Sequence, residues 1–244
     1  MGWSWVLALT AAGLVASTAN AAFGIGGGLL VMPLLTLGFG PRMVIPYTVP
    51  MFIASNVMVA WRYRGQTDRR YLIWLVPGVV VGIVVGTWFL RLAPSQIVRE
   101  IMGGVAVVFV AVEALRLLVR RPLPVLPLVA GVPLSVASGL ASALTNLGGT
   151  VISLVLLGRG LVPAAFVATL NMIMVVMSAT KMVAFGGVGL IGLRGFFLAM
   201  PSVPAVLLGS YWGRAINQRL DPTWFRWVML LLIGTSAVLL VVGY

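Results

Sequence analysis

Two glycine-rich clusters are the residues best suited to chemistry in this sequence. The first contains Gly24, Gly26, Gly27 and Gly28, and the second is the run Thr145-Asn146-Leu147-Gly148-Gly149-Thr150. Each cluster interrupts an apolar stretch. Glycine lets a ligand approach the bare backbone, and a helix that restarts after such a break carries free amides and partial positive charge at its N-terminus. The clusters therefore favour a site for a small anion. For scattered glycines such as Gly103-Gly104, close helix packing is the better interpretation.

Polar residues inside apolar stretches are the next candidates, because their side chains could donate hydrogen bonds to an oxyanion. Five of them lie within predicted spans: Asn56, Asn171, Ser178, Thr180 and Lys181. Asn146 is the strongest amide candidate, since it lies in the second break itself. Hydrogen bonding between helices explains any single one of these residues equally well. Lys181 could neutralise an anion, but we expect its ammonium, one turn from the end of a span, to extend to the membrane interface.

The scarcity of titratable side chains limits other chemistry. The chain has four acidic residues, no histidine and no cysteine. A membrane-embedded enzyme that acts on lipid-linked phosphates, the main rival interpretation, would call for paired carboxylates, histidine or a metal site. We therefore expect no enzyme and no cofactor. Glu113 and Arg116 favour a local ion pair over a proton relay, and the sequence offers little for ion coupling through side chains.

The composition indicates that these residues lie in a lipid bilayer. The chain is 61% hydrophobic and 8% charged, and apolar runs of about 20 residues, enough to cross a hydrocarbon core, recur along it. Its net charge of +12 comes from arginines in short connections, where they orient a protein in the bilayer. We predict an all-α polytopic membrane protein that contacts lipid and binds no nucleic acid.

The predicted helical segments fall into two similar halves, 1–121 and 122–244, which form two repeats of one integral membrane domain. They are Trp3 to Ala22, Leu29 to Leu37, Val44 to Trp61, Tyr71 to Leu90, Ile97 to Val119, Leu126 to Leu144, Thr150 to Leu157, Ala164 to Phe185, Leu193 to Tyr211 and Thr223 to Val242. Gly26-Gly27 corresponds to Gly148-Gly149, and Pro41 corresponds to Pro163. The stretch ending at Ala19-Asn20-Ala21 resembles a secretory signal, but we expect it to be retained as the first helix.

The direction of the second repeat can be predicted from length and charge. One continuous helix from Trp3 to Leu37 would be about 52 Å long at 1.5 Å per residue, against a core of about 30 Å. If each broken segment instead dips in and returns, the halves are inverted and the two sides carry eleven and five basic residues. Parallel halves would divide them nine to seven. The positive-inside rule favours inversion, with the N-terminus outside the cell.

These residues resemble the TauE/SafE sulfite exporter family. The resemblance is carried by Gly24-Ile25-Gly26-Gly27-Gly28 with Pro33, by Tyr63 to Arg70, and by Pro77-Gly78 with Gly82 to Gly86. It implies movement of sulfite or organosulfur anions across the cytoplasmic membrane, often outward. On this reading a site between two hairpin tips alternates between the two sides, with backbone amides from the first tip and the side chains of Thr145, Asn146 and Thr150 from the second. A channel and a homodimer remain open alternatives.

Overall fold

The computed structural model of the chain describes residues 3–23, 27–98, 100–101, 103–105, 107–108, 111, 128–157, 159 and 161–217. Helices dominate these residues and no strand occurs among them, as predicted. Five helical segments of the described residues are long and apolar enough to cross a membrane: Trp3–Ala21, Pro41–Arg62, Arg69–Leu92, Ala165–Gly187 and Gly195–Gly213. The chain is therefore a multi-pass membrane protein.

Each predicted broken segment is a pair of helices packed against each other. The first pair is α1 (Trp3–Phe23) and α2 (Gly27–Phe39), and the second is α7 (Leu128–Thr145) and α8 (Gly148–Leu157). The predicted restart after each glycine cluster is thus confirmed. The second break consists of Asn146 and Leu147, whereas Gly24 and Gly26 of the first cluster lie outside the described residues.

Proline divides two of the predicted spans. The span predicted from Val44 is α3 (Pro41–Tyr47) followed by α4 (Val49–Arg62), joined at Thr48. Pro50 has no amide hydrogen for the carbonyl of Pro46, so the regular ladder fails there. The span predicted as Leu193 to Tyr211 is confirmed as a segment long enough to cross a membrane, Gly195–Gly213. A turn at Met200 and Pro201 divides it into α10 (Leu193–Ala199) and α11 (Ser202–Asn217).

The other spans match their predictions where they are described. They are α5 (Arg69–Leu92), which Asp68 caps by accepting a 3.0 Å hydrogen bond from the amide of Arg70, and α9 (Pro163–Gly187). Helical residues between 95 and 111 follow α5. Three predicted features lie outside the described residues: the Glu113 and Arg116 pair, the boundary between the halves at 120–124, and the span from Thr223 to Val242.

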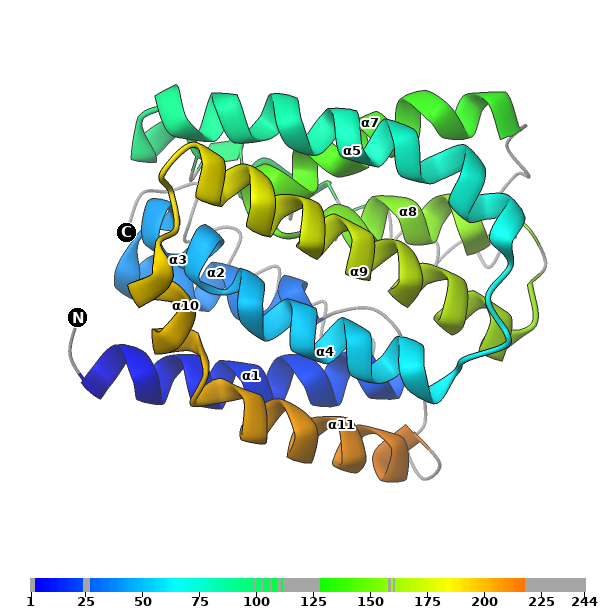
Figure 1. Cartoon of the computed structure of the whole chain (residues 1–244), viewed down its shortest axis with the longest axis horizontal. Helices are drawn as coiled ribbons and strands as arrows, with labels where there is room; N and C mark the ends of the chain where they lie inside the picture. Colours follow the sequence, from blue (N-terminus) through cyan, green and yellow to red (C-terminus); the bar gives the residue numbers. More distant parts are fainter. Residues whose placement is uncertain are drawn as a thin grey trace.

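The long helices lie side by side, with α4 and α9 in contact near the middle of the bundle (Figure 1). These two helices run in opposite directions: α4 runs toward the right end of the view and α9 toward the left. On one side of them α1 packs against α11, and on the other side α5 packs against α7. Each hairpin is therefore attached to a helix from the other half of the sequence.

Glycine allows these outer helix pairs to approach closely. A Cβ atom built at Gly82 of α5 would lie 2.1 Å from the carbonyl oxygen of Val136, and one at Gly139 of α7 would lie 2.2 Å from the carbonyl oxygen of Val79. Gly209 of α11 meets α1 in the same way, with 2.5 Å to the carbonyl oxygen of Leu14. Such contacts fit membrane helices, whose association depends on van der Waals packing.

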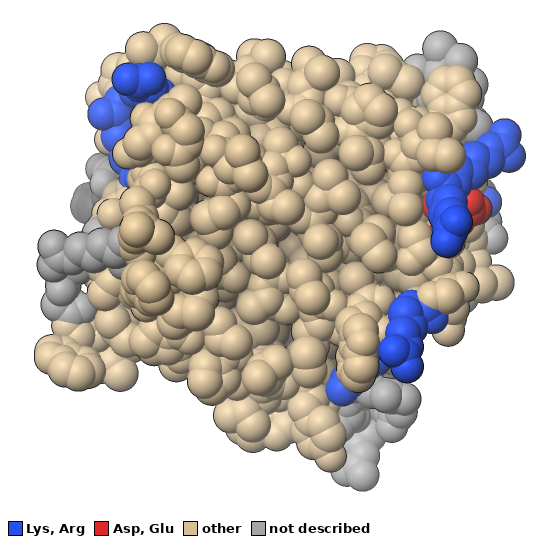
Figure 2. All heavy atoms as spheres, viewed as in Figure 1, with Lys and Arg blue, Asp and Glu red and all other residues tan. Residues whose placement is uncertain are grey.

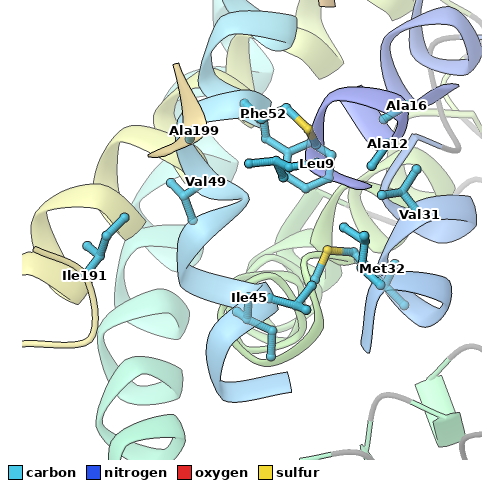
Figure 3. Packing of buried hydrophobic residues seen from close by; sticks show 14 of the residues in the cluster. Leu9, Ala12, Ala16, Val31, Met32, Ile45, Val49, Phe52, Ile191 and Ala199 are labelled. Atoms are coloured by element: carbon cyan, nitrogen blue, oxygen red, sulfur yellow. The ribbon is translucent and has the colours of Figure 1, made fainter. Parts of the chain in front are cut away.

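A tightly packed apolar cluster holds the first hairpin to the rest of the fold. Met32 of α2 and Ile45 of α3 lie next to each other in it, and Leu9 of α1 packs near Phe52 of α4 (Figure 3). All four side chains are buried. The stretch that resembles a secretory signal is therefore an integral part of this core.

Charged side chains gather at the two ends of the helices and leave an uncharged band between them (Figure 2). At one end, the guanidinium of Arg159 lies 5.9 Å from the ring centre of Tyr71, near the start of α5. At the other end, Arg42 at the start of α3 donates a hydrogen bond to the carbonyl of Ala93 at the end of α5. The band between the ends suits the hydrocarbon core of a bilayer.

The glycine contact between α5 and α7 can be tested by adding a single methyl group. We expect Gly82→Ala to lower the thermal unfolding temperature of the detergent-purified protein, because its Cβ would collide with backbone that cannot move aside. Gly38→Ala is the control, since nothing lies within 4 Å of a Cβ there. Equal unfolding temperatures for Gly82→Ala and the wild type would show that the contact is not tight.

Candidate functional site

The second helix break is a well-ordered turn held by its own side chains. Asn146 has φ 58°, a left-handed conformation that asparagine tolerates better than most residues. The hydroxyl of Thr145 accepts a 3.1 Å hydrogen bond from the amide of Leu147 and donates one of 2.6 Å to the carbonyl of Ala141. Thr150 donates to the carbonyl of Leu147 at 2.5 Å. The side chain of Asn146 is left to make longer-range contacts.

Asn146 connects the second break to the first half of the chain. Its Nδ2 donates to Thr48 Oγ1 at 3.0 Å and to the carbonyl of Ile45 at 3.1 Å, and it lies 3.5 Å from Met32 Sδ. The start of α2 reaches the same place, because a Cβ at Gly28 would lie 2.8 Å from the backbone oxygen of Asn146. The beginning of the second helix of the first hairpin thus meets the break of the second.

Lys181 of α9 is buried at this meeting point, with 3% of its surface exposed. Its ammonium donates to Asn146 Oδ1 and, at 3.4 Å, to the carbonyl of Ser142. No carboxylate pairs with it among the described residues. The expected extension to the interface is wrong, because α9 continues to Gly187 and Lys181 faces the inside of the bundle.

A second polar cluster joins α1, α4 and α9. Asn20 Nδ2 donates to Asn56 Oδ1 at 3.1 Å and to Asn171 Oδ1 at 3.4 Å. Asn56 Nδ2 donates to Ser178 Oγ at 3.3 Å and to the carbonyl of Met174 at 3.4 Å, while Asn171 Nδ2 donates to the carbonyl of Val167 at 2.9 Å. Both N–H groups of the Asn56 amide and one of the Asn171 amide are therefore already used within the protein.

The glycines of the clusters contact protein atoms closely. A Cβ at Gly27 would lie 2.5 Å from the carbonyl oxygen of Ala16, and one at Gly148 would lie 2.4 Å from that of Ser138. Gly149 faces the flexible end of Met174, whose Cε would lie 2.9 Å from an added Cβ. Gly27 and Gly148 thus close the hairpins, and a substitution at either would disturb packing as well as any site.

Sequence reasoning missed three buried partners of the site: Asn20, Thr48 and Ser142. The repeat offers a signal for two of them. The 122-residue offset that relates Gly26 to Gly148 also relates Asn20 to Ser142 and Asn56 to Ser178. Helical spacing offers another, because Asn171, Ser178 and Lys181 are seven and three residues apart and so share one face of α9.

The arrangement suits binding rather than bond-making chemistry. Lys181, Asn146 and Thr48 bring together an ammonium, an amide and a hydroxyl in the interior of the bundle. Among the described residues there is no cluster of histidine, cysteine, aspartate or glutamate that could hold a metal ion. What these groups can do together is hold a small anion away from water.

Comparison with known proteins agrees with this assessment. No curated protein and no solved structure matches the chain. The model of the family described as sulfite exporter TauE/SafE matches residues 9–240, which include the second hairpin, all but the first six residues of the first, and every residue of the two polar clusters. The chain therefore belongs to the TauE/SafE family of membrane sulfite exporters.

Proposed function

We propose that this protein moves a small sulfur-containing anion, such as sulfite or a sulfonate, across the cytoplasmic membrane, and that the anion binds between Lys181 and the second helix break. The observation that carries the proposal is the buried ammonium of Lys181, which no carboxylate among the described residues neutralises. A charge inside a membrane domain is costly unless it is paired or serves a pathway. An anionic substrate would supply the missing charge.

Asn146 and Thr48 complete the binding groups. In the structure Asn146 Oδ1 accepts from Lys181, and Asn146 Nδ2 donates to Thr48 and to Ile45. An anion that takes the ammonium from Asn146 would gain a charge-assisted hydrogen bond, which is stronger than the bond between the ammonium and a neutral amide. Thr48 and Asn146 would donate to the oxygens of the anion by giving up bonds that they make now, Thr48 to the carbonyl of Val44 and Asn146 to Thr48 and Ile45.

Alternating access would follow from two inverted repeats. The opposite directions of α4 and α9 support inversion, as do the reciprocal attachments of α1 to α11 and of α7 to α5. Arg159 next to Tyr71 supports it as well, because parallel halves would have put Arg159 on the side of Arg42 instead. In transporters of this design the substrate site lies between repeats that move relative to each other.

Charge supports an outward direction of transport. The loop between α4 and α5 carries Arg62, Arg64, Arg69 and Arg70, and the positive-inside rule assigns such a loop to the cytoplasm. A small pocket at this end lies between α1, α4 and α11 and is lined by Ala21, Met58, Val59, Arg62, Tyr63 and Ser210. A negative cell interior would then drive an anion outward.

Replacing the buried ammonium separates transport from folding. We expect Lys181→Met to reduce sulfite flux in proteoliposomes by about 10- to 100-fold, the usual value of a hydrogen bond to a charged group. Its unfolding temperature should stay the same or rise, since an apolar side chain of similar size replaces a buried charge. Thr87→Val, at a buried hydroxyl on α5 that bonds only its own helix, is the control. Wild-type flux in Lys181→Met would contradict the assigned site.

A carboxylate beside Lys181 should compete with the substrate. We expect Asn146→Asp to raise the KM for sulfite at least about tenfold, because it gives the ammonium an internal partner, and to raise the unfolding temperature. Asn146→Gly tolerates the same backbone conformation and adds no charge, so its KM should change less. Flux measured over a range of sulfite concentrations decides between the two, and an unchanged KM in Asn146→Asp would argue against anion binding at Lys181.

Cysteine labelling tests the inverted topology, and the chain has no native cysteine to interfere. Gln66 and Gly187 are exposed in the α4–α5 loop and at the end of α9. In intact cells, we expect a membrane-impermeant maleimide to label Gly187→Cys and to leave Gln66→Cys unlabelled until the membrane is opened. Labelling of both cysteines from one side would refute inversion.

A further inference from the structure

We propose that Asn20, Asn56 and Asn171 form a binding site for a monovalent cation of about the size of Na⁺. These residues come from α1, α4 and α9, and each is at least 96% buried. Asn20 Oδ1 has no hydrogen-bond partner. A buried amide oxygen without a donor costs free energy unless something binds it, so the Asn20 amide is not fully satisfied in the orientation that it has here.

The other two amides are oriented by their own hydrogen bonds. Asn56 Nδ2 is held by Ser178 Oγ and the carbonyl of Met174, and Asn171 Nδ2 is held by the carbonyl of Val167. Their Oδ1 atoms consequently both face Asn20, whose Nδ2 lies 3.1 Å from one and 3.4 Å from the other. Two fixed carbonyl oxygens that converge on one point create a negative potential there, which repels an anion and attracts a cation.

A half-turn of the Asn20 amide completes the site. The turn exchanges Nδ2 and Oδ1 and brings Oδ1 next to the oxygens of Asn56 and Asn171, so that an ion between them contacts three amide oxygens. It breaks no bond to Oδ1, because that atom has none. Contacts between the ion and oxygen replace the two hydrogen bonds lost from Nδ2, and Nδ2 then needs water as its acceptor at the former place of Oδ1. Water can provide the remaining ligands, as is common for hard cations.

The chemistry of the ligands favours a monovalent ion. Divalent cations are held mainly by carboxylates, and none of the three ligands carries a charge. Neutral carbonyl oxygens that replace a hydration shell are typical of sites for monovalent ions in channels and transporters. The site would thus allow ion coupling without an acidic residue. Because the sequence has so few acidic residues, such coupling was hard to predict from it.

The cation site is close enough to Lys181 to sense it. On α9, Lys181 follows Ser178, which holds the Asn56 amide, by three residues and the ligand Asn171 by ten, which corresponds to about 4.5 Å and about 15 Å along the helix axis. Two positive charges in this region repel each other, and an anion at Lys181 reduces the repulsion. If the proposed function holds, sulfite should therefore lower the Na⁺ concentration needed for half-saturation by about fivefold or more, and Na⁺ should do the same for sulfite.

Cation binding itself can be measured without any substrate. The unfolding temperature of the protein in lipid nanodiscs is followed by tryptophan fluorescence in NaCl, KCl or choline chloride at one concentration. We expect a rise of about 3–5 °C over choline at ten times the dissociation constant of the bound ion. Whichever of Na⁺ and K⁺ gives the larger rise is the preferred ion, and equal temperatures in all three salts would overturn the proposal.

Two substitutions at Asn20 should change the effect of the cation on the unfolding temperature in opposite directions. Asn20→Leu removes the oxygen and should abolish the rise, whereas Asn20→Asp adds charge and should lower the half-saturating concentration about tenfold. Thr87→Val is the matched control and should respond as the wild type does. If Asn20→Leu does not fold, Asn171→Leu replaces it in the same assay. An undiminished response in the folded leucine variant, or no gain in Asn20→Asp, would overturn the site.

Lys181→Met separates this proposal from the transport function. The variant removes the positive charge near the cation site, so its response to the preferred ion should be as large as that of the wild type or larger. Loss of sulfite flux with a retained ion response would support both sites. A lost ion response in Lys181→Met would mean that the ion binds through the anion site, and would contradict the amide cluster.

Discussion

The hydrogen bond from Lys181 to Asn146 is the interaction on which the centre of this protein depends. It connects α9 to the second helix break, and Asn146 in turn contacts Thr48 and Ile45 near the start of α4. Three separate parts of the chain are thus joined through one amide. Inside a membrane domain there is no bulk water to replace such contacts, so buried polar groups must find partners in protein or ligand. The buried ammonium makes this centre costly, and the proposed anion would supply the charge that it lacks.

The two polar clusters would bind ligands of opposite charge. The first is built around the ammonium of Lys181, which donates to Asn146, whereas in the second the amide oxygens of Asn56 and Asn171 both face Asn20. Both clusters use the same face of α9 and contact α4. A small shift of α9 against α4 would therefore act on both at once. Coupling between two ligands needs such a shared element with two arrangements, and the α4–α9 contact is the natural candidate.

The apolar pattern was sufficient to predict most of the fold, because about 20 apolar residues in a row have few alternatives to a membrane helix. It did not show local breaks inside a span, as at Pro201, where a turn divides one predicted span into two helices. For the site, the glycine clusters located the breaks and Asn146. Whether the Lys181 side chain is buried depended on which face of α9 packs inside the bundle. The roles of Asn20 and Thr48 as its neighbours in the two clusters depended on contacts between distant segments. Neither is readable from one sequence without the packing of its helices.

The close glycine contacts have a consequence for how such a chain can assemble. Gly82 and Gly139 fasten the second hairpin to α5, and Gly209 fastens the first hairpin to α11. Neither half of the sequence therefore buries these three glycines against itself. Under the proposed inversion, a first half made alone would bury its glycines only by pairing with a second copy of itself in the opposite membrane orientation. The fused chain contains both orientations. Each half is therefore synthesised together with its partner and need not meet it by diffusion in the membrane.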